Sequence, residues 1–358
     1  MKDKMNINQV ERLTGVLKRN IRFFEKEGLF LPKRNRVNGY CVYGETEIWR
    51  IKTWLGIMEM KRKAISILLI CYVVLSLCAC GKRDDEQVWN IESYEGREDI
   101  ISVEKLDLEG VIPDGVEVST YEVRYQCDEC EVVSYLSVPN ECIEKQEAYP
   151  CIIYNRGGNR EYGANTPEYI AYLAYSFEKI TFATQYRGVD GGTGTEEFGG
   201  ADLNDVLKLV DICEEFAFVD MEHLYMMGVS RGGMMTYMAC REDDRIKKAV
   251  VISGMSDAFM SYEERTDMQT VFNELVKVTP KDDPAAYEKR SATYWPDEIN
   301  CPLLIIHSKQ DEKVSYEQAE KIAQALEDAG KEYKFVTYED DVHGAHPEDL
   351  QIIMEWCQ

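Results

Sequence analysis

The chain has 358 residues, 45% of them hydrophobic, and its 41 Lys and Arg against 65 Asp and Glu give a formal net charge of −24. The length suggests about two domains, and the ordinary apolar fraction excludes a disordered chain, a collagen and a multi-span membrane protein. The charge is uneven, because residues 1–63 hold 15 basic and 7 acidic residues (net +8), residues 64–81 hold no charge, and residues 82–358 hold 26 basic and 58 acidic residues (net −32). A basic head and an acidic body indicate two units with different partners.

The basic head has the pattern of two short helices followed by a hairpin. Apolar residues recur at helical spacing from Ile7 onward, and Thr14-Gly15 marks a turn before a second apolar helical face. Gly28 ends that second helix, Pro32 prevents its continuation, and Asn38-Gly39 is a tight turn between two short extended runs. The pattern predicts a small helix–turn–helix with a hairpin.

The run LTGVLKRNIRFFEKEGLFLPKRNRVNGYCVYGETEI (13–48) resembles the winged helix–turn–helix of MerR-type transcription regulators, and we expect this domain over residues 1–57. The resemblance implies DNA binding, with three basic side chains facing the major groove and three residues near the backbone: Lys18, Arg19 and Arg22, and Phe23, Arg36 and Tyr40. Leu17 replaces the usual Ser or Thr N-cap, at a cost of about 1 kcal/mol, and Cys41 replaces a wing Arg. The family's dimerisation helix does not follow, so a basic domain that binds nothing is the alternative.

Residues 60–81 have the layout of a secretory signal. Lys61-Arg62-Lys63 precedes a short apolar run, which ends in Leu77-Cys78-Ala79-Cys80. This ending resembles a bacterial lipobox, which implies cleavage before Cys80, lipid on its thiol and a linker over 82–109. A buried core helix is the alternative, because the run is shorter than the roughly 20 residues that span a bilayer.

The position of the signal, inside the chain, leaves two further hypotheses open. If the segment is not cleaved, residues 1–63 lie in the cytoplasm and 82–358 outside the membrane. Alternatively, a truncated regulator gene is read through into a lipoprotein gene that starts at Met60. In each case we expect the acidic body to lie outside a bacterial cell membrane.

The acidic body alternates apolar runs with helical patterns. Val116–Tyr125 and Val132–Val138 read as an antiparallel pair around Cys127 and Cys130. The later apolar runs are Cys151–Tyr154, Ile180–Thr184, Leu224–Met227, Ala249–Ile252 and Leu303–Ile306, and helical patterns cover 168–178, 201–216, 232–240 and 316–329. This alternation predicts an α/β fold with a mostly parallel sheet covered by helices on both faces.

Three polar residues, each following an expected strand, indicate the catalytic chemistry. The run Leu224–Met227 leads into Gly228-Val229-Ser230-Arg231-Gly232, a G-x-S-x-G nucleophile elbow between a strand and a helix. Asp311 and His343 follow two later strands, which gives the α/β-hydrolase order Ser, Asp, His. We expect Ser230 to attack a carbonyl, His343 to carry its proton and Asp311 to orient the imidazole. His346 is the alternative base, but Gly344 favours His343 because a glycine suits a tight loop that presents a side chain.

The oxyanion hole is expected from the backbone N–H of Arg231 and from the loop that holds Gly157 and Gly158. YNRGGNR (154–160), QYRG (185–188), EEFGGADLNDV (196–206) and GVSRGG together resemble the catalytic domain of the prolyl oligopeptidase (S9) family, over about residues 110–358. That resemblance implies a serine peptidase or esterase without a cofactor. Family members often carry Tyr or His where Arg156 stands, so backbone groups are the expected donors. Only a short strand pair replaces the family's β-propeller, and residues 256–295 read as a lid or an inserted connection.

The remaining features leave two classes of function open. The main hypothesis is a hydrolase that acts on a peptide or ester and is held at the membrane by lipid on Cys80 or by the apolar segment. The alternative is a MerR-type DNA-binding regulator with a fused hydrolase, in which DNA contacts only residues 1–57, because the acidic body would repel it. Cys127 and Cys130 have zinc-like spacing but no second pair, so we expect no metal, and either a local disulfide or two free thiols.

Overall fold

The computed structural model describes residues 5–14, 18, 21–22, 33–34, 41–42, 89–97, 99–108, 111 and 116–358. The chain divides into two compact units, one made of residues 1–87 and 112–115 and the other of 88–111 and 116–358.

In the first unit, the structure describes three short elements. Helix α1 (Ile7–Thr14) covers the first expected helix, and β1 (Lys33–Arg34) pairs antiparallel with β2 (Cys41–Val42), as a hairpin around Asn38-Gly39 requires. Lys18 is exposed and pairs with Glu11, with 3.3 Å between its Nζ and the carboxylate. Arg22 is also exposed. The other expected DNA contacts (Arg19, Phe23, Arg36 and Tyr40) and the expected signal over 60–81, with Cys80, lie outside the described residues.

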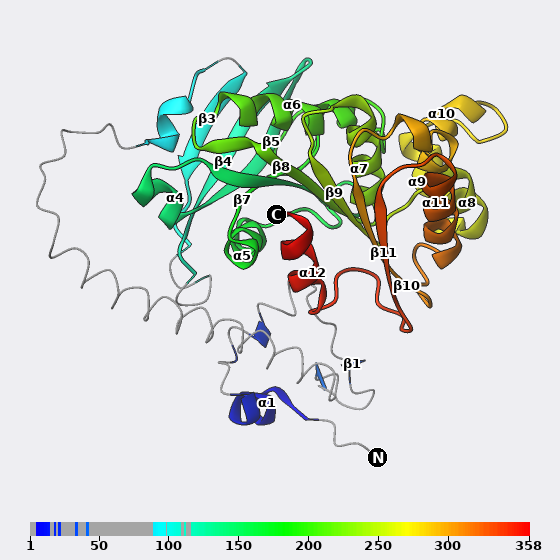
Figure 1. Cartoon of the computed structure of the whole chain (residues 1–358), viewed down its shortest axis with the longest axis horizontal. Coiled ribbons are helices and arrows are strands. Elements are labelled where there is room, and N and C mark those ends of the chain that lie inside the picture. Colours follow the sequence, from blue (N-terminus) through cyan, green and yellow to red (C-terminus); the bar gives the residue numbers. More distant parts are fainter. Residues whose placement is uncertain are drawn as a thin grey trace, which may run out of the picture. The chain divides into compact units, whose positions relative to one another are not determined.

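The second unit is built on one nine-stranded sheet (Figure 1). Its strands are β3 (Ile100–Lys105), β4 (Val118–Cys127), β5 (Cys130–Pro139), β6 (Tyr149–Asn155), β7 (Ile180–Thr184), β8 (Val219–Val229), β9 (Lys248–Ile252), β10 (Leu303–Ser308) and β11 (Tyr333–Tyr338). Their order across the sheet is β11-β10-β9-β8-β6-β7-β5-β4-β3. The strands from β11 to β7 are parallel, whereas β5, β4 and β3 join antiparallel. The predicted α/β class with a mostly parallel sheet is confirmed.

Part of the segment that was expected to be a linker is structured. Residues 91–94 form a 3-10 turn (η1, Ile91–Tyr94), and β3 pairs with β4 at the edge of the sheet. Ile91, Tyr94, Ile100 and Val103 are buried in the same hydrophobic core as the central strands. The compact unit therefore begins at Val88 rather than near residue 110.

The handedness of the strand crossovers decides which face of the sheet each helix covers. The helices are α4 (Asn140–Lys145), α5 (Pro167–Phe177), α6 (Asp202–Glu215), α7 (Arg231–Glu242), α8 (Ala258–Glu264), α9 (Thr266–Leu275), α10 (Pro284–Glu288), α11 (Tyr316–Asp328) and α12 (Asp349–Trp356). The connection from β6 to β7 runs in one direction along the sheet, and every later connection runs in the other. Because such crossovers are right-handed, α5 covers one face and α6, α7 and α11 cover the opposite face. Helix α12 packs beside α5 (Figure 1).

The insert between β9 and β10 is helical and has its own apolar contacts. Helices α9 and α10 bring Phe272 and Tyr287 together, with their ring centroids 5.2 Å apart, and both side chains are buried. Two further 3-10 turns, η2 (Ala292–Tyr294) and η3 (Pro296–Glu298), lead to β10. None of the described helices is long and apolar enough to cross a membrane.

Candidate active site

Ser230 lies on a sharp turn between β8 and α7. Its backbone has φ 58° and ψ −121°, a conformation that is costly for a residue with a side chain. A Cβ on Gly228 would collide with the carbonyl of Gly232, and one on Gly232 would collide with the carbonyl of Asn155. The two glycines therefore let the strand, the turn and the helix approach closely enough to hold Ser230 in this strained position.

The turn stands where the direction of the strand connections reverses. Strands β6 and β8 are neighbours, with Asn155 opposite Gly228, and the loops that leave them run to opposite faces of the sheet. Such a switch point is where open α/β sheets bind ligands. Gly157, in the loop after β6, is so close that a Cβ there would lie 3.9 Å from Ser230 Oγ.

Asp311 and His343 form a direct pair. His343 Nδ1 lies 2.8 Å from Asp311 Oδ2, the carboxylate is fully buried, and about a quarter of the histidine side chain is exposed. Burial raises the pKa of Asp311, but the hydrogen bond with His343 and the N–H groups of Lys313 and Val314 outweigh it, so the pKa lies below its ordinary value. The carboxylate is therefore ionised at neutral pH.

The histidine loop is tied to the elbow through the end of β9. Gly344 N–H donates to Ser253 Oγ (3.1 Å), and Ser230 N–H donates to the carbonyl of Ile252 (3.0 Å). Both Ser230 and the residue after His343 are therefore anchored on adjacent residues of one strand end. The structure gathers the three expected catalytic residues at the carboxyl edge of the sheet.

His346 has a different environment. Its ring is buried and stacks on Tyr338 with ring centroids 3.7 Å apart, and its Nε2 lies 3.1 Å from the Asp340 carboxylate. Its backbone N–H donates to Asp349 (2.6 Å). His346 is thus surrounded by structural contacts, which supports the choice of His343 as the candidate base.

The expected oxyanion donors lie on both sides of Ser230. Arg231 begins α7, where helical N–H groups lack partners within the helix, and Gly157 and Gly158 follow β6. Gly158 has φ +69°, and a Cβ there would collide with the backbone of Tyr162. The side chain of Arg156 is turned away into the protein, where it donates to the carbonyls of Gln185 and Arg160. Its buried guanidinium is not a candidate oxyanion donor.

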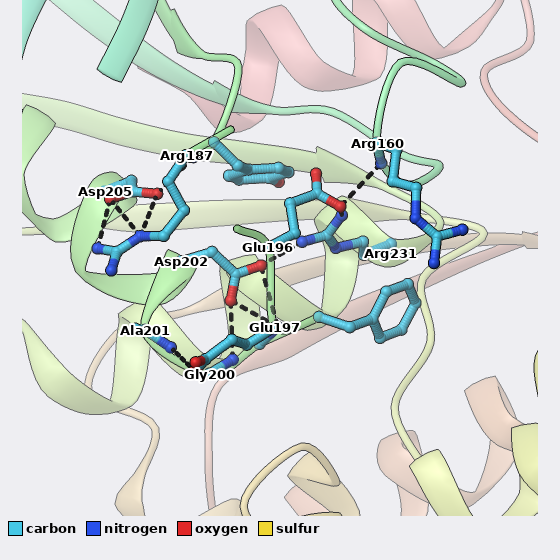
Figure 2. A network of polar contacts seen from close by, with 12 residues as sticks. Arg160, Arg187, Glu196, Glu197, Gly200, Ala201, Asp202, Asp205 and Arg231 are labelled. Carbon is cyan, nitrogen blue, oxygen red and sulfur yellow. Dashed lines mark hydrogen bonds and ion pairs between the residues drawn. The ribbon is translucent and has the colours of Figure 1, made fainter. Parts of the chain in front are cut away.

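A buried charge network that includes Arg231 adjoins the elbow (Figure 2), and it was not predicted from the sequence. Arg156, Glu196, Asp202 and Arg231 are each at most 2% exposed. Glu196 accepts a hydrogen bond from Arg156 (2.7 Å) and forms an ion pair with Arg231 (3.0 Å), and Arg231 also pairs with Asp202. The motif EEFGGADLNDV contains both acids, but only its resemblance to family members marked it.

The eight cysteines of the second unit are free thiols, including Cys127 and Cys130 at the β4–β5 turn. Burial, followed by the charge of Asp205, raises the pKa of Cys127 to about 12. Among the residues that the structure describes, no group of three or more His, Cys, Asp or Glu side chains could hold a metal ion.

Two segments of the chain match known protein families. Residues 180–357 match the model of the prolyl oligopeptidase family, and residues 5–62 match that of the MerR HTH family regulatory proteins. The uncharacterized peptidase YtmA of Bacillus subtilis is 28% identical over 243 residues, which cover 67% of this chain and 93% of that protein. The peptidase YuxL of the same organism is 26% identical over 66% of this chain but only 38% of its own length.

Solved structures show the same fold. The Pyrococcus horikoshii acylaminoacyl peptidase superposes with a TM-score of 0.59 at 22% identity, over 67% of this chain and 41% of that one. An acetyl xylan esterase from Paenibacillus sp. R4 superposes with a TM-score of 0.56 at 16% identity, over 72% of this chain and 87% of the esterase. The chain thus spans well under half of the larger peptidases. It carries a serine hydrolase domain that is similar to the prolyl oligopeptidase family of peptidases, and its residues 5–62 are similar to the MerR HTH family.

Proposed function

We propose that this protein cleaves an amide or ester through a Ser230–His343–Asp311 triad and an acyl-enzyme. Ser230 Oγ attacks the carbonyl carbon of the substrate while His343 Nε2 accepts its proton. The tetrahedral oxyanion is stabilised by the backbone N–H groups of Arg231 and of Gly157 or Gly158. His343 then protonates the leaving amine or alcohol, and water attacks the acyl-enzyme by the same route in reverse.

One observation carries the proposal: the buried Asp311 carboxylate holds His343 at 2.8 Å, at the same sheet edge as a serine on a strained turn. In this arrangement Asp311 fixes the Nδ1–H tautomer, which leaves Nε2 to act as the base. The pKa of Asp311 stays below its ordinary value, so the carboxylate also stabilises the imidazolium that forms during attack.

The supported substrate class is a peptide or an ester. The family and the relatives in Bacillus subtilis favour peptide bonds. The acetyl xylan esterase, whose length this chain nearly spans, keeps ester cleavage open. One triad performs both reactions, so the acyl and leaving groups decide the preference.

The test is covalent labelling of the full chain with a fluorophosphonate probe. Wild-type protein is expected to be labelled at Ser230, and Ser230→Ala is expected to abolish labelling. Ser93→Ala, at an exposed serine in η1, is the matched control and should label like wild type. Labelling that survives in Ser230→Ala would exclude this serine as the nucleophile.

A second candidate function is DNA binding by the MerR-type segment, which the match over residues 5–62 favours. Lys18, Arg19 and Arg22 would face the major groove, with Phe23, Arg36 and Tyr40 near the backbone. We further propose that the lipobox-like run ending at Cys80 anchors the hydrolase outside the membrane by lipid. Mass spectrometry of the N-terminus of the native protein separates the two proposals: lipidated Cys80 removes the regulator, and peptides from 1–50 in the intact chain argue for it.

A further inference from the structure

The carboxylate of Glu196 lies where the two expected halves of the oxyanion hole meet. It is 2% exposed, accepts hydrogen bonds from Arg156 Nη2 (2.7 Å) and from the backbone N–H of Arg160 (2.8 Å), and forms an ion pair with Arg231 Nη1 (3.0 Å). The two hydrogen-bond donors bracket Gly157 and Gly158, and the ion pair is made with the residue after Ser230. One side chain therefore binds both segments that are expected to donate to the oxyanion (Figure 2).

Arg231 strengthens this link from the other side. Its guanidinium pairs with Asp202 at the start of α6 and donates to the carbonyl of Gly158 (3.2 Å). Asp202 is in turn fixed by the backbone N–H groups of Gly199 and Gly200. The side chain of the first expected oxyanion donor thus holds the loop of the second.

Tyr186 holds the two guanidinium groups in place. Arg231 lies 4.5 Å and Arg156 lies 4.9 Å from the centroid of its ring, and its hydroxyl donates to the carbonyl of Arg156 (3.1 Å). An aromatic face attracts guanidinium groups when the contact is removed from water. The arginines are therefore fixed by ring contacts as well as by the carboxylates.

The network has no net charge, because two guanidinium groups face two carboxylates. Burying four charges is expensive, and well-packed apolar side chains often serve stability equally well or better. What apolar side chains would not provide is a directed set of hydrogen bonds that sets the distance between two loops. The network is therefore better suited to fixing geometry than to adding stability.

We propose that Glu196 is a positioning residue that fixes the Gly157–Gly158 loop against the Ser230 turn, so that the two backbone donors converge on the oxyanion. This inference rests on the proposed function of Ser230. It predicts that damage at Glu196 weakens binding of the transition state more than binding of the substrate, because the oxyanion forms only during attack.

The test is Glu196→Gln in the full chain, with p-nitrophenyl acetate as substrate. The amide retains the size of the side chain, but its NH2 group cannot accept a hydrogen bond, so Arg156 or Arg160 loses its acceptor, and the ion pair with Arg231 is lost. We expect kcat to fall about 10- to 100-fold, as for a small misplacement of a reacting group, with KM changed less than about threefold. The affinity for a trifluoromethyl ketone, which forms a tetrahedral oxyanion adduct, should fall in parallel with kcat.

Asp205→Asn is the matched control. Asp205 is also fully buried and paired with an arginine (Arg187, 2.7 Å), but neither residue bonds to the Gly157–Gly158 loop or to Arg231. We expect both variants to lower the melting temperature, whereas in Asp205→Asn kcat and the ketone affinity should remain within about twofold of wild type.

The outcomes separate the hypotheses. An unchanged kcat and ketone affinity in Glu196→Gln would overturn the positioning role, and so would equal losses of kcat in both variants, which would indicate general destabilisation. If Glu196→Gln does not fold, Glu196→Asp, which retains the charge but is shorter, is compared with Asp205→Asn in the same way. Failure of the proposed function itself would be seen independently, as fluorophosphonate labelling that persists in Ser230→Ala.

Discussion

Two histidines three residues apart have opposite environments at the residue scale. His343 is partly exposed and pairs with one buried carboxylate, which leaves one ring nitrogen for chemistry. His346 is 7% exposed and is held by Tyr338, Asp340 and Asp349. From the sequence, the one argument for His343 over His346 was the glycine that follows it. The contacts in the structure distinguish a partly exposed candidate base from a buried structural histidine.

We therefore predict opposite effects of the two alanine variants. His343→Ala should lower kcat for p-nitrophenyl acetate by about 10³-fold or more, because the serine loses its base. His346→Ala should keep kcat within about threefold but destabilise the fold by about 1–3 kcal/mol, because it removes a buried stacked ring. The reverse pattern in kinetics and thermal unfolding would make His346 the base.

The carboxylates around His346 also predict a pH dependence. Burial lowers the pKa of His346, but Asp349 and Asp340 outweigh it, so its folded-state pKa lies above the ordinary value of 6.5. A raised histidine pKa contributes stability that is fully present below pH 6.5 and is lost as the pH rises through the folded-state value. The loss of unfolding free energy in His346→Gln should therefore be larger at pH 5.5 than at pH 8.5. Equal losses in urea unfolding at both pH values would contradict the charged interaction.

At the scale of elements, the sequence predicted the buried centre of the fold better than its edges. The apolar run Leu224–Met227 marks only the buried part of β8, which starts at Val219 with residues that include exposed Glu222 and His223. Strand β3 was missed because only Ile100 and Val103 of its six residues are buried, as expected for an edge strand. Short-range periodicity records burial, so weakly buried strands leave little signal.

The candidate site was predictable only where it lies next to strand ends. Ser230, Asp311 and His343 each follow a strand and could be located from the chain order of the motif. Glu196 lies in a loop without periodicity, next to a second glutamate, and reads as a surface acid. Its partner Arg231 is 35 positions away in the numbering, so only the folded chain shows that the two meet.

The close approach of the loop after β6 to the Ser230 turn predicts the effect of a substitution at Gly157. A methyl group on Gly157 would lie 3.3 Å from Ser230 Cβ and 3.1 Å from the carbonyl of Val229. Gly157→Ala should therefore fold but lose about tenfold or more in kcat/KM, because the methyl group displaces the loop or the nucleophile. Gly192→Ala is a matched control: its methyl group would lie 3.0 and 3.1 Å from two carbonyls, neither of them at the elbow. Equal activity losses in the two variants would show that crowding anywhere in the domain is sufficient.

At the scale of the whole molecule, the net charge of −24 averages two parts with opposite charge. Residues 1–63 hold 15 basic and 7 acidic residues, and residues 82–358 hold 26 basic and 58 acidic residues. The unit formed by residues 88–111 and 116–358 contains the complete nine-stranded sheet and every residue of the candidate active site. All candidate catalytic residues therefore belong to the acidic part, and only the basic part is suited to a polyanion.

This separation predicts how the full chain binds DNA. With a fluorescent random-sequence duplex at 50 mM salt, we expect the full chain to bind and a fragment of residues 88–358 to show no binding, because the body repels phosphate. The fragment should still hydrolyse p-nitrophenyl acetate, which shows that it is folded. Replacing both Lys18 and Arg22 by alanine should weaken binding and reduce the slope of log K against log[salt] by about 0.9 for each phosphate that the variant no longer neutralises. Fluorescence anisotropy across a salt series measures both quantities. Binding by the fragment, or a slope that the double variant leaves unchanged, would assign DNA binding to other residues.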